Sequence, residues 1–243
     1  MEKEFTKVSL KLQPIPPLII GLCLIVCALI VRSTLIQIRS FGRTIQVTGA
    51  AFKPITSDFA IWEAKLQCNS TDLATGYAQL KRDLELTRAF MSENGFKDNQ
   101  YQIGTVQTSQ MFDREGRPTQ CSLTQPIKIE LADVPRIGEL GRRASSLVEK
   151  GVNLGFQNIR YVYTGIEDVK IEMIKAATEN AKIRAEQLAS TTGQKVGAPT
   201  NARVGVFQIR ALHTQEVSDY GMNDVTSIEK EVVCTVQISF MID

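Results

Sequence analysis

The sequence predicts an α+β fold in which helices cover one face of a mainly antiparallel sheet, preceded by one transmembrane helix. Two observations carry the fold class: strand-like segments alternate apolar and polar residues, and three longer segments repeat their apolar residues every three to four positions. A third observation, the absence of any charged residue from Leu12 to Val31, predicts the membrane helix. The predicted order of elements after this helix is ββα-ββα-βα-ββ, which is typical of α+β domains.

The composition disfavours nucleic-acid binding and most kinds of enzyme. The 243 residues contain 28 Lys and Arg against 26 Asp and Glu, so no strongly basic surface is expected. The single histidine, His213, excludes a histidine-rich metal centre within one chain and disfavours histidine-dependent nucleophilic catalysis. The sequence contains no phosphate-binding glycine loop, dinucleotide fingerprint or nucleophile elbow. We therefore expect a protein that is not an enzyme and that has no cofactor and no metal site.

The uncharged segment near the N-terminus is long enough to cross a bilayer as a helix. Prolines stand at its entrance, so we expect the continuous helix and its lipid contact over residues 18–38, with Arg32 reaching the interface. A cleaved signal peptide is the alternative, but Val31-Arg32-Ser33 is a poor cleavage site. We expect a retained anchor over residues 1–40 and one folded domain over residues 41–243.

The flanking charges do not decide the orientation of this segment. Three lysines precede it and three arginines follow it: Lys3, Lys7, Lys11, Arg32, Arg39 and Arg43. A short stub in front of a large folded part is typical of a signal anchor. We therefore predict a single-pass protein of the inner (cytoplasmic) membrane, with its N-terminus in the cytoplasm and its main domain periplasmic or otherwise extracytoplasmic.

The first predicted unit consists of two strands and a helix. Residues 44–51 and 57–68 alternate as strands, and Lys53-Pro54 is expected to form the turn between them. A helix follows over residues 72–93, with Thr71 as its cap and Asn94-Gly95 as its stop. Its expected buried stripe consists of Leu73, Tyr77, Leu80, Leu84 and Met91.

The second predicted unit repeats this order. Residues 101–112 and 120–131 are expected to be strands, joined over residues 113–118 by a hairpin tip that contains a glycine and a proline. A helix is expected over residues 134–149, between Asp133 as its cap and Gly151 as its stop. Its expected stripe consists of Ile137, Leu140, Ala144 and Val148.

The remaining elements are a strand over residues 158–164, a helix over 166–191 and two strands over 202–212 and 230–242. The helix carries alanines at a spacing of four, which let it approach a sheet closely, so we interpret them as packing residues: Ala177, Ala181, Ala185 and Ala189. The polar segment 213–229 is expected to be a mobile excursion that begins with an exposed, non-catalytic His213.

The five cysteines fall into two groups. Cys23 and Cys27 lie in the membrane segment, where we expect apolar packing, with fatty acylation as an open alternative. Cys68, Cys121 and Cys234 lie on the apolar phase of their predicted strands, so we expect buried and inert thiols. A disulfide between two of these three in an oxidising compartment, or a redox role for at least one, stays open.

Several short motifs resemble the SIMPL-domain family of mostly bacterial cell-envelope proteins. They are Ile45-x-Val47-x-Gly49, Asp58-x-Ala60, Gly151-x-Asn153 and Ala181-Lys182-x-x-Ala185-Glu186-x-Leu188-Ala189, followed by Gly193 and Gly197. Together they span nearly the whole region after the anchor. The resemblance implies an α+β domain delivered across the membrane, assembly of members into large ring-like or hollow oligomers, and links to oxidative-stress tolerance. It implies no active site.

The expected function is therefore that of a membrane-anchored, non-enzymatic envelope protein that self-assembles as a scaffold, a compartment or a stress-related binding module. Its expected partners are other copies of itself and the lipid bilayer. The alternative is a thiol-based redox or oxidative-stress defence protein that uses Cys68, Cys121 or Cys234. That alternative requires an accessible thiol with a low pKa.

Overall fold

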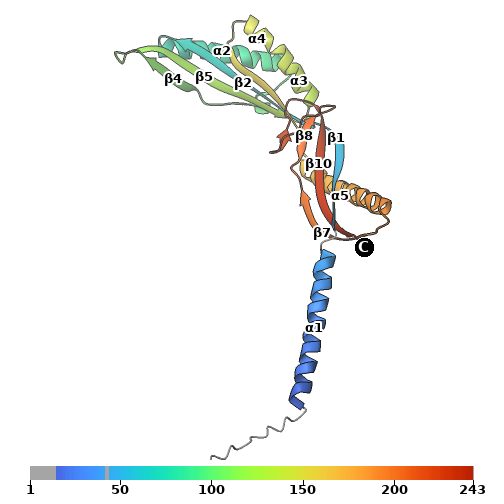
Figure 1. Ribbon diagram of the computed structural model, residues 1–243. Coiled ribbons are helices and arrows are strands. Elements are labelled where there is room, and N and C mark those ends of the chain that lie inside the picture. The colour runs from blue at the N-terminus through green and yellow to red at the C-terminus, as the bar shows by residue number, and fades with distance from the viewer. Residues whose placement is uncertain (1–14, 42–43, 243) are drawn as a thin grey trace, which may run out of the picture. The chain divides into compact units, whose positions relative to one another are not determined.

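The structure, a computed structural model, describes residues 15–41 and 44–242 (Figure 1). It confirms the α+β class and the preference for antiparallel pairing. The described strands form two five-stranded sheets, however, instead of one. β8 pairs with β9 in parallel, whereas five further pairings are antiparallel: β8–β10, β2–β5, β2–β6, β3–β5 and β4–β5.

Helix α1 (Ile15–Phe41) is the first element. Over residues 20–35, where its side chains are described, it exposes leucine, isoleucine and valine. Within the described part of the chain, no helix is both long enough and apolar enough to cross a membrane. The predicted anchor over residues 18–38 extends beyond the side chains that the structure describes. Most of its flanking charges also lie outside the described side chains. The anchor and its orientation therefore stay predictions.

The chain divides into two compact units, each of which is described by itself. Unit 1 comprises the described residues of 1–48, 181–203 and 237–243, and unit 2 comprises residues 49–180 and 204–236. Four elements contribute residues to both units because the boundaries fall within them: β1 (Thr44–Thr56), α5 (Ile166–Thr191), β7 (Val196–Val204) and β10 (Glu229–Ile242).

The first sheet has the strand order β1-β10-β8-β9, and β10 also pairs with β7. Strands β8 (Gln208–Ala211) and β9 (Met222–Asn223) are short, and β9 lies within the predicted excursion. Helix α5 has the predicted bounds, and its four alanines are at most 2% exposed, which confirms them as packing residues. The Ala50 N–H donates to the Asn180 side-chain oxygen (3.2 Å), and the Arg184 guanidinium donates to the Thr48 carbonyl (2.9 Å), so α5 is bonded to β1.

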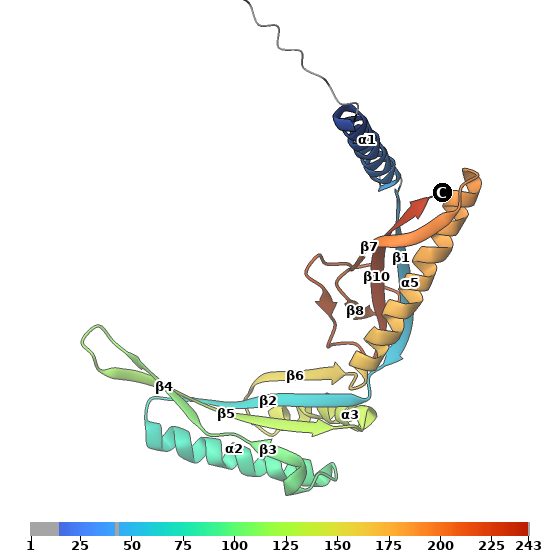
Figure 2. The same ribbon diagram turned by 90° about the horizontal axis from the view of Figure 1, so that it is seen from below.

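The second sheet belongs to unit 2 and has the order β3-β5-β2-β6, with β4 also paired to β5. Its strands are β2 (Phe59–Ser70), β3 (Tyr101–Ile103), β4 (Gln107–Phe112), β5 (Pro118–Leu131) and β6 (Leu154–Val162). Figure 2 shows α2 (Leu73–Glu93) and α3 (Val134–Arg143) on the same face of this sheet. Helices on one face are therefore confirmed here. Between them lies a core that contains Trp62, Leu66, Leu80, Leu123, Ile129 and Ile137.

The predicted turn at Lys53-Pro54 is wrong, because β1 continues through both residues to Thr56. A proline lacks the N–H that a central strand must donate. Strand β1 is an edge strand, where that loss is tolerated. The chain turns later, at Ser57 and Asp58.

Two glycines divide segments that the sequence predicts as single strands. Residues 101–112 form β3 and β4, which separate after Gly104, and residues 202–212 contain the end of β7 and all of β8, which separate at Gly205. A Cβ at Gly104 would lie 2.6 Å from Pro126 Cγ, and one at Gly205 would lie 2.5 Å from Thr235 Oγ1. Both breaks therefore lie where the backbone approaches its neighbour too closely for a side chain.

The predicted helix over residues 134–149 is also divided, into α3 and α4 (Ser145–Glu149), which meet at Ala144. The Leu147 N–H donates to the Ala144 carbonyl, three residues back, which tightens this turn. Leu147 is consequently buried, whereas Val148, which the stripe predicts to be buried, is 57% exposed. Asp133 caps α3 as predicted, because its carboxylate accepts the Arg136 N–H.

Helix α2 differs from its prediction at the cap and along the buried face. Asp72, and not Thr71, is the cap, because its carboxylate accepts the Thr75 N–H at 2.8 Å. Leu73 and Tyr77 are exposed. The buried face instead consists of Gly76, Leu80, Asp83, Thr87, Phe90 and Met91. The predicted stop at Asn94-Gly95 is confirmed, and Gly95 has a positive φ of 78°.

Candidate functional site

The three cysteines predicted as site candidates are all buried and free. Cys68 is 9% exposed, Cys121 is 3% exposed and Cys234 is fully buried. The prediction that each projects to the apolar side of its strand is therefore confirmed. Cys23 and Cys27 are exposed and free on α1.

The surroundings of two of these thiols oppose reactivity. Burial and the charge of Asp83 raise the pKa of the Cys68 thiol, and burial raises the pKa of the Cys234 thiol. A redox or nucleophilic cysteine needs the opposite shift and access to solvent. These environments favour structural thiols, and the redox alternative stays a prediction that thiol labelling can test.

Metal binding has no evident site in the described residues, where no three His, Cys, Asp or Glu side chains form a group that could hold an ion. His213 is exposed, as predicted, and it follows β8 with a positive φ of 68°. The candidate sites in the described residues are therefore exposed surfaces and cavities.

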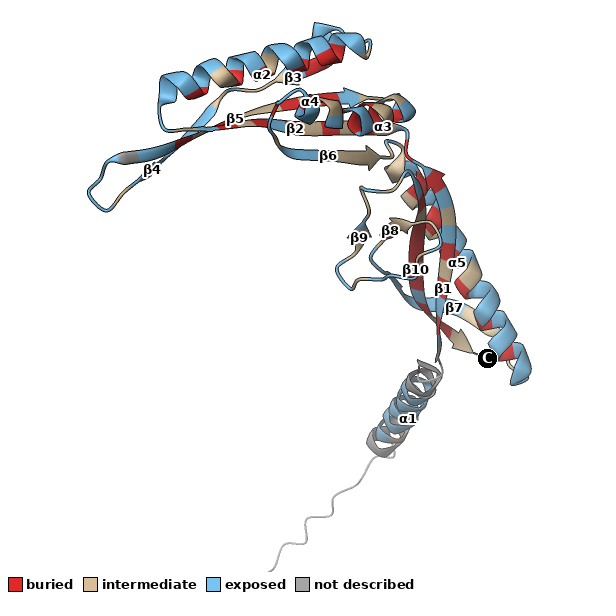
Figure 3. Ribbon diagram, turned by 90° about the horizontal axis from the view of Figure 1, so that it is seen from above, coloured by how far each residue is buried: buried red, intermediate tan, exposed pale blue. Residues whose placement is uncertain are grey.

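The β4–β5 hairpin is the most exposed strand pair of unit 2 (Figure 3). Pairing of β5 with β2 ends at Cys121, so the last part of the hairpin is only two strands wide. Every residue of β4 is exposed, including Met111 at 62% and Phe112 at 60%. Large apolar side chains on a narrow projection are typical of a contact surface.

The tip of this hairpin is held by one carboxylate. Asp113 accepts the backbone N–H groups of Glu115 and Arg117, and it also accepts the Arg117 side chain at 2.9 Å. The Arg117 N–H is the main reason that the pKa of Asp113 lies below its usual range. Gly116 has a φ of 76°, as the predicted tip requires. The tip therefore presents Phe112 from a hydrogen-bonded turn.

A second surface feature of unit 2 is an apolar hollow of about 290 Å³, which we call the valine hollow. Its walls include Val206, Val217 and Val233, and Gly205 leaves room in it because it has no side chain. Val217 is 72% exposed and Val206 is 48% exposed. The Gln208 side chain donates to the Ser218 carbonyl at 2.6 Å, which fixes one rim. None of the residues that line this hollow was a predicted site residue.

Unit 2 also contains a buried lysine that was not among the predicted site residues. Lys230 is 2% exposed, and its ammonium donates to the Tyr161 carbonyl at 2.6 Å. Burial lowers the pKa of Lys230, and the charge of Asp224 opposes that shift. A signal was present, because Lys230 is in phase with the buried Val232 and Cys234 along β10.

Comparison with known proteins identifies a family without an assigned activity. Residues 45–240 match the family model SIMPL, whose description is a protein of unknown function (DUF541). The matched region begins in β1 and ends in β10, so it includes every described element after α1. No curated protein sequence matches the chain.

Proposed function

The chain belongs to the SIMPL family, and from its surfaces we propose that it is a membrane-anchored, non-enzymatic envelope protein that self-assembles into a ring-like or hollow oligomer. In this role it serves as a scaffold, a compartment or a stress-related binding module. Its partners are other copies of itself and, through residues 18–38, the lipid bilayer.

One observation carries the proposal: Phe112 is 60% exposed on a two-stranded projection of a chain that also exposes an apolar hollow. We assign the valine hollow of a second copy as the site that receives Phe112. A cavity of about 150 Å³ holds a benzene molecule, so a hollow of about 290 Å³ is large enough for a phenyl ring. Burying a phenylalanine side chain contributes about 1.5–3 kcal/mol.

The geometry of this contact leads to rings. A projection that fits a different surface of the next copy makes a head-to-tail contact, which forms a closed ring when its rotation closes. The formal net charge of the chain is only +2, so long-range repulsion between copies is small. Each contact is weak, but many copies held together at one membrane meet at a high effective concentration.

The anchor part of the proposal is supported by the uncharged run from Leu12 to Val31 and by the helical backbone of α1. A helix of 27 residues is about 40 Å long, which exceeds a bilayer core of about 30 Å. Exposed apolar side chains along residues 20–35 agree with lipid contact. The N-terminus then lies in the cytoplasm and the SIMPL domain lies in the periplasm or otherwise outside the cytoplasm.

Light scattering of the full-length protein in detergent tests the assembly. At tens of micromolar, we expect the wild type to have a mass of several chains. Phe112→Asp places a charge in the apolar contact and is expected to lower the mass to that of one chain. Ile171→Asp also replaces an exposed apolar side chain by a carboxylate, at a position on α5 that is 70% exposed. This control should leave the mass unchanged.

Two results would contradict the proposal. If the wild type is monomeric at these concentrations, the proposed assembly is ruled out. If the wild type is oligomeric and Phe112→Asp does not lower its mass, the protein assembles, but not through the β4–β5 hairpin.

A further inference from the structure

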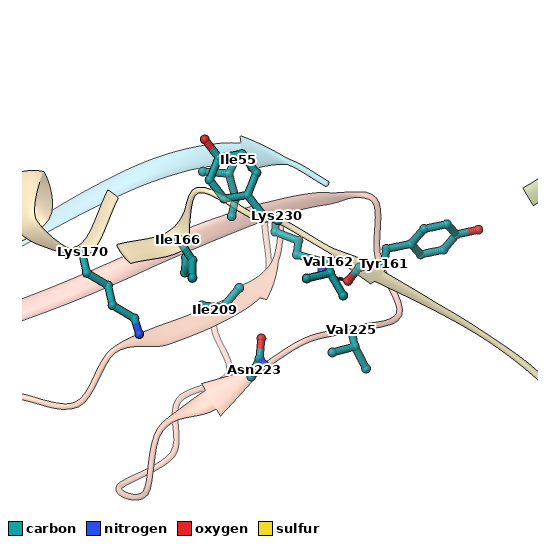
Figure 4. A pocket seen from close by; sticks show the side chains of 10 residues that line it. Ile55, Tyr161, Val162, Ile166, Lys170, Ile209, Asn223, Val225 and Lys230 are labelled. Atoms are coloured by element: carbon teal, nitrogen blue, oxygen red, sulfur yellow. Dashed lines mark hydrogen bonds between the residues drawn. The ribbon is translucent and has the colours of Figure 1, made fainter. Parts of the chain in front are cut away.

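We propose that a small cavity of unit 2, lined by Lys230, binds a short-chain organic carboxylate. The cavity measures about 160 Å³ and is distinct from the valine hollow. Figure 4 shows Lys230 extending from β10 to the backbone of Tyr161, with the side chains of Ile166 and Ile209 beside it. All of these residues belong to unit 2.

Lys230 has hydrogen-bonding capacity that the fold leaves unused. An ammonium group has three N–H donors. The Tyr161 carbonyl accepts one of them, and the described residues provide no other acceptor for this nitrogen. A buried cation with spare donors is costly unless a further acceptor reaches it. The cavity is the space from which such an acceptor can approach.

The charges around the cavity leave this position open to an anion. Lys170 also lines the cavity, but the carboxylate of Glu167 lies 2.7 Å from its ammonium and compensates its charge, whereas Lys230 has no carboxylate of the described residues within 4 Å. Asp224 lies near Lys230 without forming an ion pair within 4 Å. Its Oδ1 accepts the N–H groups of Thr226 and Ser227, and its Oδ2 is buried without a hydrogen-bond partner among the described residues. Asp224 does not line the cavity, so a ligand reaches Lys230 from the side that Asp224 does not occupy. Asp224 therefore keeps Lys230 charged without filling its donor positions.

The remaining lining selects for an apolar body. Five aliphatic side chains line the cavity, and Tyr161, Tyr163 and Asn223 stand beside them: Ile55, Val162, Ile166, Ile209 and Val225. A volume of about 160 Å³ is close to that of a cavity that holds benzene, so a ligand of six or seven heavy atoms fits. One available ammonium matches a single negative charge better than a phosphate dianion, which needs several donors. The chemistry therefore indicates a carboxylate with a short hydrocarbon chain.

Methyl NMR of the full-length protein in detergent tests this site, with pentanoate as the probe. The isoleucine methyl groups are isotope-labelled, so that Ile166 and Ile209 report on the cavity while Ile127 and Ile129 report on the core of the second sheet. We expect saturable shifts of the first pair only. Pentanol and pentylamine have the same chain without the negative charge, and they should bind at least tenfold more weakly.

Two lysine variants separate the ammonium from general effects. Lys230→Met should weaken pentanoate binding at least tenfold. Lys128→Met removes a half-exposed lysine of β5 and should bind pentanoate as the wild type does. If Lys230→Met loses its folded spectrum, Ile209→Trp tests the proposal by filling the cavity while keeping Lys230, and it should abolish the shifts.

The proposal is overturned if pentanoate causes no saturable shift, if pentanol binds equally well, or if Lys230→Met or a folded Ile209→Trp binds as the wild type does. If pentanoate causes no saturable shift, the cavity holds only water. The site is independent of the proposed assembly, so Phe112→Asp should bind pentanoate normally.

Discussion

The packing around single residues decides the chemistry available to the core thiols. Cys121 and Cys234 are at most 3% exposed, and Cys68 faces the negative charge of Asp83. Burial restricts access to all three thiols, and the raised pKa values of Cys68 and Cys234 disfavour the charged thiolate form that reactivity requires. The same packing places Asp83 itself, a titratable group, in the interior at 3% exposure.

The first prediction concerns the reactivity of these thiols. In the native full-length protein, an alkylating probe should label Cys68, Cys121 and Cys234 slowly, and denaturation should make labelling fast, because unfolding restores access. Mass spectrometry of the peptides assigns each site, and the denatured protein gives the rate for complete access. Fast native labelling of any core thiol at neutral pH would support the redox alternative.

The second prediction concerns Asp83→Asn. Burial raises the pKa of Asp83, although the hydrogen bond from Gln79 and the charge of Arg82 oppose that shift. At pH 7 the carboxylate is charged in the unfolded state, and burial disfavours that charged form in the folded state, so folding carries the cost. That cost disappears as the pH falls through the raised folded pKa toward the unfolded value of about 3.9.

We therefore expect Asp83→Asn to be more stable than the wild type at pH 7, with a difference that shrinks toward pH 3. The asparagine oxygen can still accept the Gln79 N–H. Trp62, the single tryptophan, is fully buried in the same core, so its fluorescence reports unfolding directly. A variant that is less stable than the wild type at pH 7 contradicts this account.

Residue positions on regular strands could be predicted from the sequence, whereas Asp83 could not. The strand period of two places Cys121 and Cys234 inside without knowledge of the partner element. The buried face of α2 depends on how the helix meets the sheet. A Cβ at Gly76 would lie 2.7 Å from Leu123 Cδ1, so this glycine faces the sheet and brings Asp83 to the same side.

Among the elements, α5 tests close packing most clearly. Its buried positions are all alanine apart from Val169 and Met173 at the N-terminal end. The third prediction is that Ala185→Leu, at a position with no exposed surface, destabilises the protein by about 1–3 kcal/mol through overpacking. Glu186→Leu, on the exposed side of the same helix, should change stability much less.

Denaturant unfolding of the full-length protein, followed by circular dichroism, measures both variants. Equal stability of Ala185→Leu and Glu186→Leu would mean that the alanine face is not tightly packed. The bounds of α5 agree with the sequence prediction because a long regular helix carries its own signal. The breaks at Gly104 and Gly205 were not predicted from the sequence. They depend on contacts with Pro126 and Thr235, which only folding brings close.

At the scale of the whole molecule, the fourth prediction is that the anchor is retained. The poor cleavage site at Val31-Arg32-Ser33 implies that protein extracted from membranes keeps its N-terminal residues. Intact mass spectrometry of that protein measures this directly. A soluble product that begins near Thr34 would show cleavage and would contradict the anchored form.

The α+β class of the molecule follows from local patterns, and the family match agrees with it. The division of the strands into two sheets does not follow, because β10, the last strand, pairs with β1, the first strand, and that pairing leaves no local pattern in the sequence. The valine hollow was equally hidden, since it combines residues 205–208 with residues from later in the chain. Surfaces of this kind exist only after folding.

The central claim is that Phe112 of one copy enters the valine hollow of another, and a cross-link between two kinds of chain tests it most directly. One chain keeps Phe112 and carries Arg114→Cys at the exposed tip of the same hairpin, and the other carries Val217→Cys, both with Cys23 and Cys27 replaced by serine. When the two full-length chains are mixed in detergent and oxidised, the account predicts a disulfide-linked pair that contains one chain of each kind. A mixture that forms only like-with-like pairs, or no pairs, while the wild type is oligomeric would contradict it.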